Sequence, residues 1–355
     1  MSISFIWALI AMSTIIIAQP VDGSKLVKVE TYRFSEQRFK SDDVSLFSKL
    51  LIPPTEGPHP AIIIVHGAGP NTFGGQYMQL AQIFAENGIA TLFYDKRGTG
   101  QSEGEYHETP PTMDYYARDV LTAAAWLKTH KNIDPERIGV WGHSQGGWIG
   151  PYAATLGNDI NFVINVSGPG VTPMHQIAYQ RAQQLMQSKG ISQKQAKHAE
   201  ELRHAAYRYW HSGKNYNEES KIYKRLSKES FFKHMDGWSE TLQPAESLSE
   251  NSRMFFAKRT MSFDPKKVYR SIKIPTLIIY GIDDWQIPVK ASVKAIKEVL
   301  PANPNKDITI KVFEGAGHGI MVRGKDKLMY FQKGYTEYML DWLKQRIFAK
   351  EVKSR

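Results

Sequence analysis

A short stretch of the chain has the residue types and spacing of a nucleophilic serine. Gly142-His143-Ser144-Gln145-Gly146 follows the apolar run 137–141 and precedes a segment compatible with a helix. Strand, sharp turn and helix in this order would hold Ser144 in a strained conformation above the end of a sheet. Glycines are needed on both sides, because a Cβ there would clash across the turn. The spacing therefore predicts a nucleophile at a strand-to-helix turn.

The same pattern occurs a second time, at Gly100-Gln101-Ser102-Glu103-Gly104. This copy follows the polar run 95–99 and leads into 105–111, which ends in two prolines. Neither a buried strand nor a helix adjoins it. We therefore predict that residues 100–104 form a loop with no catalytic role.

A serine hydroxyl needs a base to take its proton, and the base needs a third group to fix its tautomer. In open parallel sheets such groups follow the carboxyl ends of strands. Asp283 and Asp284 follow the apolar run 277–280, and His318 follows the run 308–313. The order serine, aspartate, histidine is that of a hydrolase with its nucleophile on such a turn. His318 is the predicted base, and either aspartate fits as the acid.

The elements that would position these residues alternate between buried strands and helices. Continuous apolar runs predict buried strands at 61–65, 89–95, 137–142, 162–167, 274–281 and 308–313. Helical spacing predicts helices at 73–87, 115–130 with Asp114 as its cap, 289–300 and 329–348. Alternating residues at 27–34 and 44–52 predict a pair of antiparallel strands. The fold class is therefore α/β, with a mostly parallel doubly wound sheet and antiparallel N-terminal strands.

Between residues 172 and 262 the pattern changes. No buried strand is visible in this part of the sequence, and helical spacing predicts helices near 174–188, 192–211 and 217–234. We predict a helical cap at 172–262, inserted into a core made of residues 24–171 and 263–355.

The first 18 residues are almost wholly apolar, and a polar segment follows them. We predict that residues 1–23 are a secretory signal peptide with Ala18 at the cleavage position, so that the protein is secreted or periplasmic. An uncleaved anchor that associates with the membrane and a buried N-terminal helix are the alternatives.

Composition excludes several function classes. The chain has no cysteine, so disulfides, thiolate catalysis and cysteine-ligated zinc are excluded. The sequence has no His-Glu-x-x-His motif, which disfavours a metallohydrolase, and we predict neither a metal nor a cofactor. The net charge of +10 is spread along 355 residues without a nucleic-acid motif. We predict a solvated basic surface and no nucleic-acid partner.

Five motifs in this order resemble the α/β-hydrolase superfamily, and most of all its secreted esterase and serine-aminopeptidase-like branch with a helical lid. They lie at residues 66–70, 94–102, 142–146, 280–288 and 315–318. Gly281 and Pro288 match the family's Gly-x-x-Asp-x-x-x-Pro pattern, which implies that Asp284 rather than Asp283 is the acid.

The resemblance also implies an oxyanion hole formed by the backbone N–H groups of Ala68 and Gln145. His66 and His143 adjoin these positions, and we expect their side chains to point elsewhere and to have structural roles. Asp95 and Arg97 are expected to organise the loop after strand 89–95, with a substrate role for Arg97 as the alternative.

The family places its helical insertion over the serine, so some aromatic residues of the cap are expected to line an acyl pocket. The aromatic residues in question are Tyr207, Tyr209, Trp210, Phe231, Phe232, Trp238, Phe255 and Phe256. Packing within a small helical core is the alternative for each of them.

Together the residues and the resemblance predict a metal-free serine hydrolase that cleaves the ester of a small-molecule acyl substrate. An aminopeptidase or amide hydrolase is the first alternative, and a thioester hydrolase the second. An aminopeptidase would need an acidic group in the cap to receive the substrate ammonium. The acidic residues in question are Glu200, Glu201, Glu218 and Glu219. A non-catalytic binding protein is the alternative from another class.

Overall fold

The computed structural model describes residues 34–72, 74–107, 110–235 and 263–348. The predicted signal peptide at residues 1–23 lies outside these ranges and stays a prediction. Within the described ranges, no helix has the length and apolar character needed to cross a membrane.

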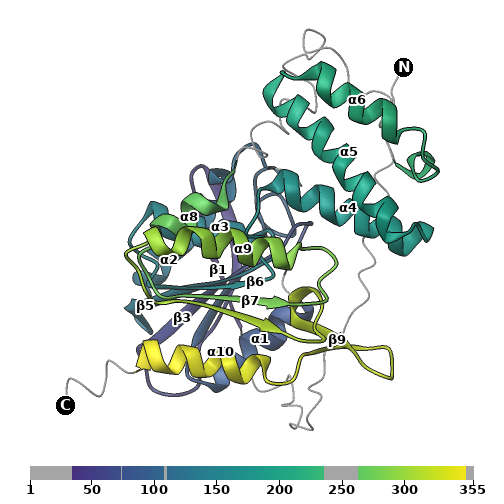
Figure 1. The fold of residues 1–355 in the computed structure, drawn as a ribbon. Helices are drawn as coiled ribbons and strands as arrows, with labels where there is room; N and C mark the ends of the chain where they lie inside the picture. The colour runs from purple at the N-terminus through teal and green to yellow at the C-terminus, as the bar shows by residue number, and fades with distance from the viewer. Residues whose placement is uncertain (1–33, 73, 108–109, 236–262, 349–355) are drawn as a thin grey trace.

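An eight-stranded sheet forms the centre of the fold (Figure 1), in the order β1-β2-β4-β3-β5-β6-β7-β8. The strands are β1 (Ser35–Ser41), β2 (Val44–Leu51), β3 (His59–Val65), β4 (Ala90–Tyr94), β5 (Ile133–His143), β6 (Phe162–Val166), β7 (Thr276–Gly281) and β8 (Ile308–Phe313). From β4 to β8 all neighbours are parallel, whereas β2 is antiparallel to both β1 and β4. The predicted α/β class with a mostly parallel sheet is confirmed.

Strand β3 pairs with β4 on one side and with β5 on the other. The chain therefore winds outward in one direction after β3 and in the other direction after β5. At such a reversal the loops after the two strands separate, and a crevice opens at their carboxyl ends. The loop after β3 begins at His66, and the turn after β5 contains Ser144.

Helices cover both faces of the sheet, as Figure 1 shows. Helices α1 (Gly75–Glu86) and α10 (Tyr335–Leu343) lie on one face, and α2 (Asp114–Lys128), α3 (Gly146–Leu156), α8 (Pro265–Ser271) and α9 (Val289–Val299) lie on the other. Because side chains alternate along a strand, Ile62 and Ile64 pack under α1 and α10, whereas Ile63 and Val65 pack under α2 and α3. Burial on both faces explains the continuous apolar runs of the strands.

Helices α4 (Pro173–Lys189), α5 (Gln193–Ser212) and α6 (Tyr216–Leu226) follow β6 and stand beside the sheet (Figure 1). The Thr172 hydroxyl caps α4, and Ser192 and Gln195 form a capping box at the start of α5. The three predicted helices are present, although the third is shorter than expected and a separate 3₁₀ turn follows at Phe232–His234. Residues 236–262 of the predicted cap lie outside the described ranges.

The N-terminal hairpin differs from the expected one. The predicted strand 27–34 lies outside the described residues except for Phe34, which is not in a strand. The partner of β2 is instead β1, and the tight turn between them has Asp42 at a φ of 52°. The charged residues of β1 obscured its alternation, in which Phe39 and Ser41 are the buried positions.

Two further expectations at helix ends are wrong. Residues Met329–Phe331 form β10, which pairs with β9 (Met321–Arg323), and α10 begins only after Gly334, whose φ is 81°. A residue with positive φ interrupts a helix, so the expected helix 329–348 cannot be continuous. Asp114 does not cap α2: it is the first residue of that helix, and its carboxylate accepts a hydrogen bond from Tyr152.

Candidate active site

Ser144 lies on the tight turn between β5 and α3, as its sequence context predicts. Its φ of 54° is unusual for a residue with a Cβ, and its N–H donates to Val166 O at 3.0 Å. A Cβ on Gly142 would lie 2.2 Å from Gly146 O, and one on Gly146 would lie 2.0 Å from Val65 O. Both glycines are therefore required by the close approach of backbone to backbone, which holds the serine in its strained conformation.

His318 and Asp284 come together from the loops after β8 and β7. Asp284 Oδ2 accepts a hydrogen bond from His318 Nδ1 at 2.8 Å, and Asp284 Oδ1 accepts from the N–H groups of Gln286 and Ile287 at 2.9 and 3.1 Å. The Asp284 side chain is fully buried, whereas Asp283 is exposed. This arrangement puts the proton of His318 on Nδ1 and leaves Nε2 as an acceptor. Of the two candidate aspartates, the structure places Asp284 against the imidazole.

The predicted site residues Ser144, His318, Ala68 and Gln145 all line one cavity of about 440 Å³. Within the described ranges, the Ser144 hydroxyl makes no hydrogen bond to His318. Hydrogen bonds between a nucleophile and its base are often long in a free enzyme and tighten when substrate is bound.

The loop after β3 and the start of α3 bring the two predicted oxyanion donors to this cavity. The Gly67 N–H donates to the Tyr77 hydroxyl at 3.3 Å, whereas the Ala68 N–H has no acceptor among the described residues. Gln145 immediately precedes α3, whose positive dipole end points toward the same place. The arrangement can stabilise a negative oxygen.

Lys96 is a site residue that the sequence analysis did not single out. Its side chain is buried, and its Nζ donates to Gly67 O at 2.6 Å and to Gln145 Oε1 at 3.0 Å. It therefore joins the two backbone segments that carry Ala68 and Gln145. Its position directly after β4, in the same layer of strand ends as the other site residues, was the available signal.

His143 differs from the expectation that its side chain points away from the site. It lines the cavity, and its ring centroid lies 4.8 Å from that of His318. Its Nδ1 and the Tyr77 hydroxyl form a hydrogen bond of 3.2 Å. Burial, with a smaller effect of His318, lowers the pKa of His143 well below its usual value, so this imidazole stays neutral beside His318.

His66 has the expected structural role. Its Nε2–H donates to Tyr94 O at 2.7 Å, and it does not line the cavity. Burial, helped by the charge of Lys96, lowers the pKa of His66 to about 3. The ring is therefore neutral at neutral pH and fixes the loop after β3 to the end of β4.

Asp95 and Arg97 organise the loop after β4, as predicted. Arg97 is buried against Asp119, with N–O distances of 2.5 and 3.3 Å, and Asp95 accepts a hydrogen bond from the Gln101 N–H at 2.9 Å. Arg97 does not line the cavity, so the structure gives no support to a role in binding substrate.

From the cap, the cavity is lined by polar and aliphatic residues of α4 rather than by aromatic ones. The lining residues from this helix are Pro173, Gln176, Ile177, Gln180 and Arg181. The described aromatic residues expected there do not line the cavity and pack within the cap: Tyr207, Tyr209, Trp210, Phe231 and Phe232. That expectation is wrong for these five, because two packed helices bury their own large side chains first. Trp238, Phe255 and Phe256 lie outside the described residues.

Comparison with known proteins finds similar sequences. The esterase EstD of Thermotoga maritima is 25% identical over 315 residues, which cover 85% of this chain and 65% of EstD. The quorum-quenching protein AidA of Acinetobacter baumannii is 35% identical over 127 residues, or 34% of this chain and 39% of AidA. The chain thus spans less than two thirds of the length of these relatives.

Solved structures show the same fold. An esterase of Pyrococcus furiosus superposes with a TM-score of 0.59 at 16% identity, covering 94% of this chain and 98% of the esterase. An acylaminoacyl peptidase of Pyrococcus horikoshii gives a TM-score of 0.54 at 20% identity, covering 90% of this chain and 42% of the peptidase. The model of the family described as serine aminopeptidase, S33, matches residues 56–323, which is most of the chain. The fold, the site and this match lead to one conclusion: the chain belongs to the serine aminopeptidase S33 family of α/β hydrolases.

Proposed function

We propose that the protein is a serine hydrolase that cleaves carboxylic esters through an acyl-enzyme on Ser144. The observation that carries the proposal is that Ser144, on its strained turn, shares one cavity with a histidine bonded to a buried aspartate. The relation to EstD supports ester cleavage in particular.

In the proposed reaction, Ser144 Oγ attacks the ester carbonyl carbon while His318 Nε2 takes the hydroxyl proton. The N–H groups of Ala68 and Gln145 stabilise the negative oxygen of the tetrahedral intermediate. This intermediate expels the alcohol, which takes the proton from His318. A water molecule then repeats the attack on the acyl-enzyme with His318 as base, and it releases the carboxylic acid and free Ser144. Asp284 stays ionised and orients the imidazole throughout.

The charges around the cavity favour an ester over the free amino terminus of a peptide. Arg181 is the one side chain with a fixed charge among the described lining residues, and none of these residues is a carboxylate. A substrate ammonium would therefore meet a like charge and no partner, which costs binding energy. A neutral or anionic acyl substrate is the better match.

The acidic residues of the cap do not change this argument. Glu201 pairs with Arg225 at 2.5 Å, and Glu219 pairs with Arg208 at 2.7 Å. Glu200 and Glu218 do not line the cavity either. Aminopeptidase activity, which the family's description suggests, stays the second candidate.

A paired activity screen tests the proposal. Turnover of p-nitrophenyl esters should exceed turnover of aminoacyl p-nitroanilides by at least about 100-fold, and Ser144→Ala should abolish the ester activity. Higher activity on the anilides would contradict the esterase proposal and support an aminopeptidase instead. Full ester turnover by the Ser144→Ala variant would contradict the proposed mechanism, in which Ser144 is the nucleophile.

A further inference from the structure

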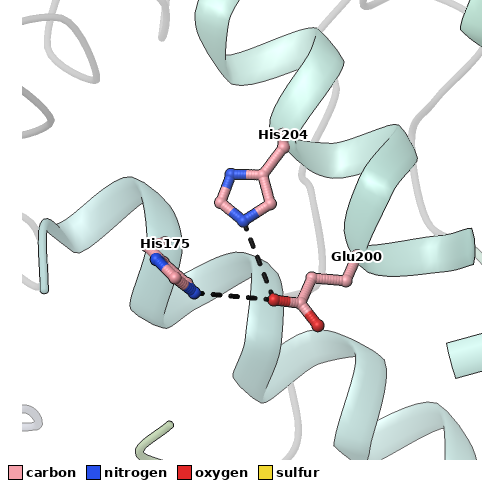
Figure 2. A group of neighbouring side chains, drawn as sticks. All are labelled: His175, Glu200 and His204. Carbon is pink, nitrogen blue, oxygen red and sulfur yellow. Dashed lines mark ion pairs between the residues drawn. The ribbon is translucent and has the colours of Figure 1, made fainter. Parts of the chain in front are cut away.

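Two histidines and a glutamate come together in the cap, and none of the three lines the active-site cavity. His175 belongs to α4, and Glu200 and His204 belong to α5 (Figure 2). Figure 2 shows both imidazole rings directed toward the same carboxylate oxygen. Each of the three side chains is partly buried.

The positions of the three residues follow from the geometry of the two helices. Glu200 and His204 are four residues apart on α5, so they project from the same face of that helix. His175 lies in the first turn of α4, which the Thr172 cap fixes, and α4 packs against α5. The cluster therefore joins elements that are well ordered without it.

The distances within the cluster are too long for hydrogen bonds. Glu200 Oε1 lies 3.7 Å from His175 Nε2 and 3.7 Å from His204 Nε2. A direct hydrogen bond would need about 3 Å. Another histidine of α5 makes such a bond: His198 Nδ1 lies 2.7 Å from Glu229 Oε1. In contrast with that pair, the cluster leaves space between its three polar atoms.

The three polar atoms lie slightly farther apart than the ligands of a bound metal ion do. The three ligand atoms lie within 4.8 Å of one another. Three ligands of a tetrahedral zinc, each about 2.0–2.1 Å from the metal, would lie about 3.3 Å apart. Side-chain rotations that move each atom by up to about 1 Å would close the difference, and water would complete the tetrahedron.

We propose that His175, Glu200 and His204 bind one zinc ion, which ties α5 to the first turn of α4. Two imidazoles and a carboxylate form a ligand set that zinc uses widely. The ion would stabilise the cap and take no part in ester cleavage, because its ligands do not line the cavity. The ion would nevertheless lie close to the substrate site. Gln176, which follows His175 in the chain, lines the cavity and donates a hydrogen bond to Gln286 O at 3.0 Å.

Calorimetry on the untagged full-length protein tests the site. After dialysis against EDTA and return to chelator-free buffer at neutral pH, titration with ZnCl₂ should show one saturable site per chain. Glu200→Gln and His204→Ala should each weaken binding by at least about tenfold, because even residues that only support a ligand have effects of that size. The matched control is His198→Ala, which removes a histidine from the same helix and should leave zinc affinity unchanged.

A second measurement keeps the test decisive if a variant fails to fold. X-ray absorption at the zinc edge of the wild-type protein with one equivalent of zinc should show two imidazole ligands and oxygen. Absence of saturable binding to the wild type would overturn the proposal. So would an absorption spectrum without two imidazoles, folded Glu200→Gln and His204→Ala variants with unchanged affinity, or an equal loss in His198→Ala.

Discussion

The segments 142–146 and 100–104 share the same spacing of glycines and serine. Their serines nevertheless lie in different surroundings, one at the cavity and the other in a loop. Ser144 follows the central strand β5, has a φ of 54° and lines the cavity. Ser102 lies in the loop after β4, where its hydroxyl donates to Asp95 O at 2.7 Å and accepts from the Phe47 N–H at 2.9 Å. The hydroxyl of Ser102 is thus occupied by backbone groups of its own loop and of β2.

Both turns are tightly packed, so packing alone does not distinguish them. A Cβ on Gly100 would lie 2.1 Å from Asp95 Oδ2, much as one on Gly146 would meet Val65 O. What distinguishes Ser144 is its place at the carboxyl end of a strand beside the reversal of the sheet, where partners from other strand ends converge. The pattern of five residues acquires a chemical meaning only from that position.

The largest expected difference between the two turns is the effect on kcat of replacing a carboxylate associated with each serine. Asp284→Asn should lower kcat on p-nitrophenyl esters by about 10⁴-fold, because the amide favours the wrong tautomer of His318. Glu103→Gln, beside Ser102, is the matched change and should leave kcat unchanged. If kcat of Asp284→Asn stayed within tenfold of the wild type, the assigned acid would be wrong.

A smaller effect is expected at Lys96, whose Nζ joins the loop after β3 to Gln145 beside Ser144. Lys96→Met should lower kcat by about 10- to 100-fold with little change in KM, somewhat less than the loss of an oxyanion donor itself. Lys128→Met, which removes a surface ion pair with Asp159, is the control and should leave both constants unchanged. A defect confined to KM would show that Lys96 does not position the oxyanion hole.

Acid should destabilise the protein through the buried histidines beside Ser144. Below pH 6.5 the unfolded chain protonates His66, whereas the folded chain does not until pH is near its pKa of about 3. The unfolded state then binds more protons, so stability falls as pH falls, by about 2 kcal/mol between pH 6.5 and 5 for this one group. Urea unfolding should show this decrease, and His66→Gln should reduce its slope. If the slope were unchanged in this variant, His66 would not be the source of the loss of stability in acid.

The smallest expected effect is the one at Ser102. Ser102→Ala removes two hydrogen bonds to the backbone and should reduce the free energy of unfolding by about 1 kcal/mol. Its kcat/KM on esters should equal that of the wild type. A loss of activity without a loss of stability would mean that the second turn also serves the reaction.

The sequence predicted what depends on local pattern and on chain order. Buried strands are recognisable by their continuous apolar runs, so the placement of Ser144, Asp284 and His318 at strand ends followed from the sequence. The loop at 100–104 followed in the same way, from its polar neighbours.

What the sequence did not predict depends on tertiary contacts. The hydrogen bonds of Lys96 to the loop after β3 and to Gln145 exist only because strand order puts β4 and β5 on either side of β3. The cluster of His175 and Glu200 needs the packing of α4 against α5. Strand β1 was missed because charged residues on its exposed face hid its period of two.

The most direct test of the account is the site of labelling by a fluorophosphonate, a probe that reacts with activated serines. Peptide mapping by mass spectrometry of the folded wild-type protein should find a stoichiometric adduct on Ser144 and none on Ser102, and unfolding in urea before labelling should abolish the adduct. A folded protein that carries the adduct on Ser102, or none on Ser144, would contradict the central claim.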